Sequence, residues 1–144
     1  MKAVKAINEK QRNDALYVRK KVFVEEQNVP IEIETDEYEA FAEHVVLYDD
    51  HQPVGAGRFR VIGNTGKLER ICVLPQYRGK GAGNIILETL EKLAAEKGLK
   101  KIKLNAQVQV ENFYKKHGYQ TVSDIFMDAG IPHVTMEKTL HPHS

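Results

Sequence analysis

The stretch CVLPQYRGKGAGNIILETLEKLAAEKG, from Cys72 to Gly98, joins a glycine-rich loop to an amphipathic pattern. The loop, Arg78 to Gly83, contains three glycines and two cations, and apolar residues then recur at helical spacing until Gly98 ends the pattern. A loop between a strand and a helix has free backbone N–H groups that point the same way as the positive end of the helix dipole. The stretch therefore predicts a site for a phosphate or pyrophosphate, with charge added by Arg78 and Lys80.

The spacing of the glycines narrows the identity of the phosphate ligand. No Ser or Thr follows a Gly-Lys pair, so the mononucleotide P-loop is excluded. Gly79, Gly81 and Gly83 are spaced by two throughout, which does not match the Gly-x-Gly-x-x-Gly pattern of dinucleotide-binding folds. A loop that binds nothing stays open as an alternative, because a glycine-rich hexapeptide is often only a mobile connection.

The patterns outside this stretch predict an α+β fold around a mixed sheet. Strand-like and helical segments alternate, with an antiparallel meander before the glycine loop and a strand-helix-strand unit after it. The expected elements, in chain order, are a helix at 13–27 opened by Asn13 or Asp14, a short acidic helix at 36–43, strands at 44–50, 54–63 and 67–74, the helix ending at Gly98, a strand at 101–107, a helix from Val110 that ends at Gly118, and strands from Tyr119 and from His133.

Length and composition limit the class of protein. The chain has 144 residues, of which 42% are hydrophobic, so we expect one domain spanning residues 1–144. A formal net charge of +1 gives no overall field that would favour nucleic acid or a membrane surface. The single cysteine, Cys72, excludes an internal disulfide and a cysteine-based metal cluster. The N-terminus is polar and no segment has the length of a membrane span, so the cytoplasm is the expected location.

The glycine loop and the residues before it match a longer motif. Arg78, Gly81 and Gly83 follow Val73, Pro75 and Tyr77, and together they resemble the Val-x-Pro-x-Tyr-Arg-x-x-Gly-x-Gly signature of the GNAT superfamily of acyl-CoA-dependent N-acetyltransferases. This resemblance implies a mixed, mostly antiparallel sheet of about seven strands with about four helices. It also implies that the loop cradles the pyrophosphate of coenzyme A, with acetyl-CoA as the donor substrate.

Two further segments extend the resemblance. Leu68 to Val73 is similar to the strand whose backbone pairs with the pantetheine arm and holds the thioester carbonyl, and Asn112 to Tyr119 is similar to the helix that carries a tyrosine. That tyrosine, Tyr114 here, would protonate the leaving thiolate. The coenzyme A site implied by the family comprises Ile71, Cys72, Val73, Arg78, Gly79, Lys80, Gly81, Ala82, Gly83, Asn105, Gln107 and Tyr114.

The ends of the chain resemble a bacterial subgroup of small GNAT proteins, the YjcF-like and ElaA-like ones. The segments that carry this resemblance are Val18 to Pro30, His44, Leu104 to Gln107, and Asp128 to His133. Two residues depart from the common pattern, because Gln107 stands where many members have Asn and Val110 where many have Ala. These departures concern the detailed contacts to the cofactor.

The reaction needs a neutral amine, a polarised carbonyl and a proton for the departing sulfur. Strand alternation predicts that Glu69 lies on the face of Ile71 and Val73, so Glu69 is the candidate general base, acting through water, although a salt-bridged strand carboxylate is the alternative. Tyr114 is the candidate acid. Alternation also directs Cys72 into the core, which argues against a route through an acetyl-cysteine.

The remaining candidates concern the acceptor. His44 and His133 each open a strand and either could relay a proton, while the scattered histidines form no metal triad, so no metal is expected. The acidic segment from Glu25 to Glu39 suits an amine acceptor and equally suits a solvated loop. The sequence favours transfer of an acetyl group to a primary amine of a small molecule or peptide, by direct attack in a ternary complex. The alternative is a non-catalytic acyl-CoA sensor, and the family resemblance makes a homodimer possible.

Overall fold

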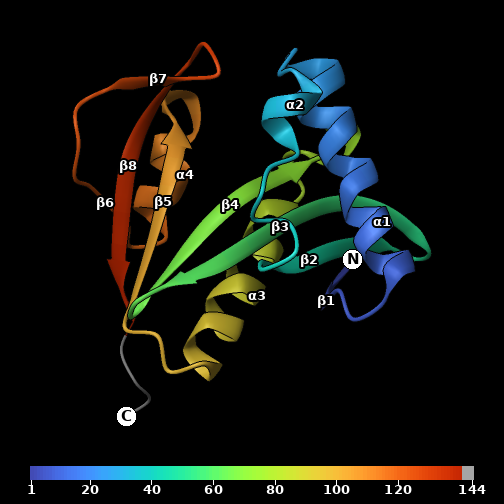
Figure 1. Ribbon diagram of the computed structural model, residues 1–144, viewed down its shortest axis with the longest axis horizontal. Helices are drawn as coiled ribbons and strands as arrows, with labels where there is room; N and C mark the ends of the chain where they lie inside the picture. The colour runs from blue at the N-terminus through green and yellow to red at the C-terminus, as the bar shows by residue number, and fades with distance from the viewer. Residues whose placement is uncertain (141–144) are drawn as a thin grey trace.

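The computed structural model describes residues 1–140, which build one eight-stranded mixed sheet (Figure 1). The strand order is β1-β2-β3-β4-β5-β8-β6, and β7 pairs with β8. β4 and β5 pair in parallel and the other neighbours are antiparallel, which confirms the predicted mixed α+β sheet. The strands are β1 (Lys2–Lys5), β2 (Glu43–Asp49), β3 (Gln52–Ile62), β4 (Thr65–Val73), β5 (Lys101–Gln107), β6 (Gln120–Thr121), β7 (Phe126–Asp128) and β8 (Ile131–Thr139).

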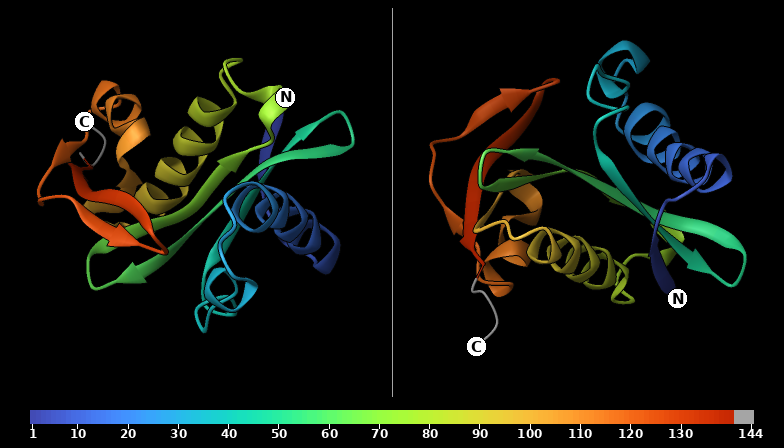
Figure 2. Two further views of the ribbon diagram at one scale, coloured as in Figure 1. Left: turned by 90° about the horizontal axis from the view of Figure 1, so that it is seen from above. Right: turned by 60° about the horizontal axis from the view of Figure 1, so that its bottom comes forward.

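Helices cover both faces of the sheet. Figure 2 shows α1 and α2 on one face and α3 and α4 on the other. The longer helices are α1 (Glu9–Arg19), which continues as the π-helical η1 (Lys20–Glu26), and α3 (Ala82–Glu96). The shorter ones are α2 (Ile31–Glu34), α4 (Glu111–Lys116) and the two 3₁₀ turns η2 (Pro75–Tyr77) and η3 (Val108–Val110). No helix in residues 1–140 has the length and apolar character needed to cross a membrane.

The N-terminal region differs from the sequence prediction. α1 begins at Glu9 because Asn8 caps it, its side chain accepting a hydrogen bond from the backbone N–H of Gln11 at 2.8 Å. The predicted caps Asn13 and Asp14 lie inside the helix, so the predicted helix start was wrong. The acidic helix predicted at 36–43 was also wrong, since residues 37–42 form turns and a bend, Glu43 begins β2, and the short helix α2 precedes them.

Two strand glycines allow α3 to pack closely on the sheet. A Cβ atom built at Gly55 would lie 2.6 Å from Cδ1 of Ile86, and one built at Gly57 would lie 2.9 Å from Cδ1 of Leu90. Any larger residue at either position would therefore collide with α3. The two glycines also show which side chains of β3 and β4 face α3, because residues paired with them share that face.

A bulge interrupts the alternation of β4. Ala56 pairs with Cys72 and Arg58 pairs with Glu69, so two residues, Arg70 and Ile71, lie opposite Gly57. Arg70 has a positive φ of 59°, which is the strained backbone of the bulge. Beyond the extra residue the pattern shifts, and Glu69 faces α1 whereas Ile71 faces α3. The prediction that Glu69 shares a face with Ile71 and Val73 was therefore wrong.

The parallel pairing of β4 with β5 is short. It joins residues 65–68 of β4 to residues 101–104 of β5 and ends there. Beyond that point the two strands diverge, as Figure 1 shows. The edges of residues 69–73 and of residues 105–107 that would face each other are consequently free of ladder pairing.

Candidate active site

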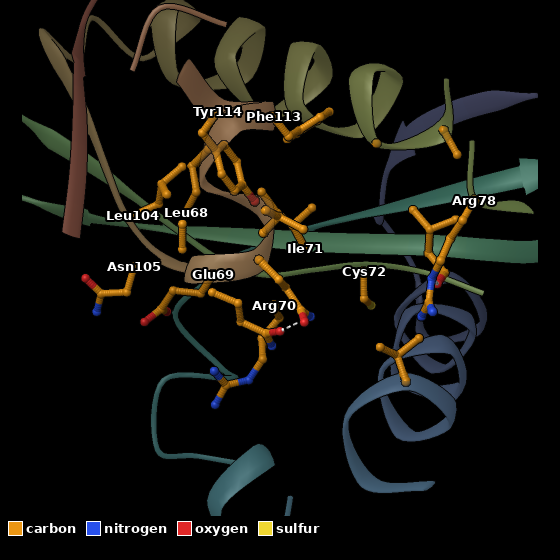
Figure 3. A pocket seen from close by; sticks show the side chains of 18 of the residues that line it. Leu68, Glu69, Arg70, Ile71, Cys72, Arg78, Leu104, Asn105, Phe113 and Tyr114 are labelled. Atoms are coloured by element: carbon orange, nitrogen blue, oxygen red, sulfur yellow. Dashed lines mark hydrogen bonds between the residues drawn. The ribbon is translucent and has the colours of Figure 1, made fainter. Parts of the chain in front are cut away.

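A cavity of about 950 Å³ lies where β4 and β5 diverge. Its walls come from β4, the glycine loop, β5, α4, η1 and the strands β7 and β8. It contains Glu69 and every residue predicted for the coenzyme A site except Lys80. In Figure 3, Tyr114 and Phe113 lie on one side of the strand that carries Ile71, and Glu69, Arg70 and Asn105 lie on the other.

The glycine loop opens into this cavity at the N-terminus of α3. Gly79 and Gly81 have φ angles of +77° and +82°, a conformation that residues with a Cβ rarely adopt, and Gly81 is the N-cap of α3. Among residues 1–140, and apart from the two flanking residues, no heavy atom lies within 4 Å of a Cβ built at either glycine. Gly83 lies in the first turn of α3, where a built Cβ would be 3.3 Å from Phe113. The loop therefore has open space in front of the helix dipole, which fits an anionic group.

The two cations of the loop are placed differently from the sequence expectation. Arg78 donates to both carboxylate oxygens of Glu26 at 2.7 and 2.8 Å and to the carbonyl of Val73 at 3.0 Å. Its guanidinium thus links the end of β4 to η1. The ammonium of Lys80 lies 5.5 Å above the ring of Tyr77, outside the cavity lining. The positive character of the loop comes mainly from its backbone N–H groups and the helix dipole.

Tyr114 extends from α4 toward the diverging strands. Its ring makes edge-to-face contacts with Phe113 and Tyr119, at centroid distances of 5.1 and 5.7 Å. Burial raises the pKa of Tyr114, so the phenol stays protonated. Its hydroxyl makes no hydrogen bond within residues 1–140. The hydroxyl is therefore free to donate a hydrogen bond to a ligand in the cavity.

These features together match a known family. A family model described as "Acetyltransferase (GNAT) domain" matches residues 6–140. The chain belongs to the GNAT acetyltransferase family. Its relatives include YjcF of Bacillus subtilis, an uncharacterized N-acetyltransferase that is 58% identical over 139 residues, covering 96% of this chain and 99% of YjcF. The chain is accordingly an N-acetyltransferase.

Two solved structures have the same fold. The crystal structure of Escherichia coli ElaA has a TM-score of 0.83 and 22% sequence identity, and the alignment covers 95% of this chain and 97% of ElaA. The crystal structure of an aminoglycoside 6'-N-acetyltransferase complexed with coenzyme A has a TM-score of 0.77 and 18% identity, covering 100% and 99% of the two chains. The predicted fold and the predicted YjcF-like and ElaA-like resemblance are confirmed.

Cys72 lines the cavity, but its thiol is unreactive. Its side chain faces α1 and is buried, and burial raises the pKa of its thiol to about 12. A thiol with such a pKa carries almost no thiolate near neutral pH, and the thiolate is the nucleophilic form. The residue acts as a small apolar part of the core.

Glu69 is a salt-bridged carboxylate on the α1 face of the sheet. It accepts hydrogen bonds from Arg58 at 2.9 Å and from Arg60 at 2.9 Å, and Lys67 lies 3.6 Å away. Burial alone would raise the pKa of Glu69, but the hydrogen bond from Arg60 and the charges of Arg58 and Lys67 outweigh burial and hold it below its usual value. A carboxylate with a lowered pKa is a weak base.

An ion-pair network extends from Glu69 to the N-terminal helices. Arg19, Arg58 and Glu34 are each at most 1% exposed, and Arg19 donates to Glu34 at 2.6 Å and to Glu39 at 2.7 Å. Arg58 donates to Asp36 and Glu39, and Arg70 donates to Asp36 and to the carbonyl of Glu34. Glu34 is therefore fully buried in its ion pair, and Asp36 and Glu39 are partly buried in theirs, so these three carboxylates do not belong to a solvated loop.

Polar residues of β5 and β8 line the cavity on the α1 face. Thr135 donates to the side-chain oxygen of Asn105 at 2.9 Å, and Gln107 donates to Gln27 at the end of η1, also at 2.9 Å. His133 pairs with Gln107 and lines the cavity, whereas His44 does not line it. The other sequence candidate for proton relay, His44, directs its Nε2 toward the carbonyl of Glu39.

Sequence reasoning missed several lining residues. Lys116 and His117 follow Phe113 by three and four positions, a spacing that places them on one helix face and could have identified them. Asp128 ends β7 and begins a segment that carries the subgroup resemblance, but no pattern in the sequence indicated that its side chain lines the cavity. Within residues 1–140 no group of three or more His, Cys, Asp or Glu side chains is arranged to hold a metal ion.

Proposed function

We propose that this acetyltransferase uses acetyl-CoA to acetylate a primary amine of a small molecule or peptide, by direct attack in a ternary complex. The observation that carries the proposal is one cavity that joins the free edge of β4, the phenol of Tyr114 and the open glycine loop at the start of α3. In coenzyme A the pantetheine arm links the pyrophosphate to the sulfur, so the free edge of β4 would take the pantetheine arm between the glycine loop, which would take the pyrophosphate, and Tyr114, which would meet the sulfur.

The donor would bind along the α3 face of the cavity. The backbone N–H groups of Gly79, Gly81 and Gly83 would hold the pyrophosphate, with Ala82 and Asn84 at the helix start beside them. The backbone near Ile71 and Val73 is free of pairing with β5 and would pair with the pantetheine amides. The coenzyme A complex of the aminoglycoside 6'-N-acetyltransferase, which has the same fold, supports this assignment of the donor.

Tyr114 would act on the departing sulfur. The pKa of a phenol is ordinarily about 10 and that of a thiol about 8.5. Since burial raises the pKa of Tyr114 further, its hydroxyl would stabilise the thiolate as a hydrogen-bond donor. Its proton would pass to sulfur only as a proton lost by the acetylated nitrogen replaces it on the phenol. A backbone N–H near Ile71 would hold the carbonyl oxygen as charge develops on it.

The acceptor would enter from the α1 face, opposite the donor. Glu69, Asn105 and Gln107 lie on that face, as do Phe23 and Gln27 of the region around η1. The negative charge of Glu69 would help to orient the incoming ammonium. Its lowered pKa makes Glu69 a weak general base, so its predicted catalytic role is proposed here in this lesser, orienting form.

Coenzyme A release tests the proposal. The purified chain would be mixed with acetyl-CoA and, separately, with spermidine, L-lysine, kanamycin and a lysine-containing peptide, and free thiol would be followed together with the mass of each amine. Thiol release matched by acetylation of one amine is the expected result. Acetyl-CoA binding without release on any of them would instead favour an acyl-CoA sensor.

The kinetic order tests the ternary complex. Double-reciprocal plots at several amine concentrations should intersect, because both substrates must be bound before transfer. Parallel lines would indicate an acetylated enzyme. Cys72→Ala should then leave the rate within about twofold, since the thiol with its raised pKa takes no part in the transfer.

A further inference from the structure

A general base for the acceptor is not supplied by Glu69, whose carboxylate is held by Arg58, Arg60 and Lys67. The amine that attacks must be neutral, whereas primary alkylamines are protonated at neutral pH. A group on the acceptor side of the cavity that accepts this proton would raise the fraction of neutral amine. The candidates are the other side chains that line the cavity on the α1 face.

We propose that His133 is the general base, an assignment that rests on the acetyl transfer proposed above. His133 lies on β8 opposite Gln107, and so on the α1 face, where Gln107 reaches Gln27 of the N-terminal segment. Its side chain lines the same cavity as Glu69 and Tyr114 and is 9% exposed. It therefore lies at the acceptor side of the diverging strands and is largely shielded from bulk water.

The hydrogen bonding of His133 leaves one ring nitrogen ready to accept a proton. Nδ1 lies 2.7 Å from the carbonyl oxygen of Ile131, and because a carbonyl only accepts, Nδ1 must carry the hydrogen. Nε2 of the neutral ring then has a lone pair, and Nε2 has no hydrogen-bond partner within residues 1–140. The ring of Phe126 stacks on the imidazole at a centroid distance of 6.0 Å and an angle of 24°, which fixes its orientation.

The other histidines do not meet these conditions. Nε2 of His44 already lies 3.1 Å from the carbonyl of Glu39, outside the cavity, and burial lowers the pKa of His44. His117 lines the cavity at the glycine loop, where its Nε2 contacts the side-chain oxygen of Asn84 at 2.7 Å. That position belongs to the donor end of the cavity.

The proposed step balances in protons. Nε2 of His133 takes one proton from the bound ammonium and passes it to solvent. The amine nitrogen then forms a bond to the acetyl carbon as the carbon–sulfur bond breaks. The sulfur leaves with a proton from Tyr114, and the second proton lost by the nitrogen returns to the tyrosinate. One proton is released for each acetyl group transferred.

The charged groups that share the cavity with His133 modify its environment. Asp128 lies on β7, the strand that pairs with β8, and Glu69, Lys67 and Arg70 line the β4 side. Removal of Glu69 would therefore change the field at His133, so variants of both residues are needed to separate their effects.

The test uses His133→Asn, because the asparagine amide can still donate to the carbonyl of Ile131 but supplies no Nε2. With whichever of spermidine, L-lysine, kanamycin or the lysine peptide the wild type acetylates, kcat/KM at pH 7 should fall about 100-fold. The acetyl-CoA dissociation constant should stay within about twofold. Added imidazole should restore part of the rate, and the variant rate should keep rising with pH because the amine must lose its proton unaided.

Three results separate the possible failures. His51→Asn, in an exposed turn, should behave as the wild type, and Glu69→Gln should lower kcat/KM less than His133→Asn does. If kcat/KM of His133→Asn has the same pH dependence as kcat/KM of the wild type, the assignment of His133 is wrong while the proposed function stands. The same conclusion would follow if ¹⁵N NMR showed hydrogen on Nε2 of His133. No acetylation of any amine by the wild type would overturn the proposed function and the assignment together.

Discussion

Replacement of Tyr114 by Phe should separate catalysis from stability. The hydroxyl has no hydrogen-bond partner in residues 1–140, and the ring contacts with Phe113 and Tyr119 persist in phenylalanine, so the free energy of unfolding should change by less than about 1 kcal/mol. The loss of the proton donor should lower kcat about 100-fold, which corresponds to about 2.7 kcal/mol of activation free energy.

Tyr119→Phe is the matched control. The hydroxyl of Tyr119 donates to Glu91 at 2.6 Å, and Lys138 also contacts that carboxylate at 3.2 Å. Loss of this charged hydrogen bond should cost about 1.5–3 kcal/mol, or roughly 3–12 °C in Tm, with kcat unchanged. Thiol release and thermal unfolding would be measured on both variants. Wild-type kcat in Tyr114→Phe, or equal losses of kcat in the two variants, would refute the role given to Tyr114.

Three further perturbations test the loop and the ion pairs. Gly81→Val and Gly98→Val both place a Cβ at a positive φ, of +82° and +77°, at the two ends of α3. Calorimetry should show loss of acetyl-CoA affinity in Gly81→Val alone. Equal affinities in the two variants would show that the glycine loop does not bind the ligand. Arg19→Met leaves the buried Glu34 without its closest cation, so the free energy of unfolding measured in urea should fall by about 3–5 kcal/mol. Lys21→Met removes an exposed ion pair and should lower it by about 0.5 kcal/mol or less. Similar losses in the two variants would contradict the role of the network. Burial would raise the pKa values of Asp36, Glu39 and Glu69, but their contacts with arginine outweigh burial and lower them. The stabilisation from these carboxylates is therefore fully present above their unfolded-state pKa of about 4 and is lost as the pH falls through their folded-state pKa values. A free energy of unfolding that stays constant from pH 6 to pH 3 would contradict this account.

The sequence predicted the glycine loop and the start of α3 well because both depend on local backbone chemistry. Glycines at Gly79 and Gly81, followed by a regular apolar pattern, specify a loop and a helix start with little help from distant residues. The helix that carries Tyr114 is likewise specified by the sequence of its own segment. Both segments lie where the sequence indicated, and they line one cavity.

The α1 face of the cavity was predicted less well because it depends on contacts far apart in the chain. The alternation rule failed at β4 because Arg70 forms a bulge opposite Gly57, and that bulge turns Glu69 to the α1 face. No local pattern indicates that Glu69 meets Arg58 and Arg60, or that Glu34 meets Arg19 fifteen residues earlier. The carboxylate at the predicted base position thus has a lowered pKa that only the tertiary structure reveals.

The position of coenzyme A is the central claim, and amide chemical-shift mapping tests it most directly. A ¹⁵N-labelled chain would be titrated with coenzyme A and the shifts of backbone N–H groups recorded. The largest changes should fall on residues 71–73 and 79–83, the free edge of β4 and the glycine loop. Binding that shifts residues around Tyr38, Phe41 and Lys97 instead, where a smaller pocket lies, or no binding at all, would contradict the account.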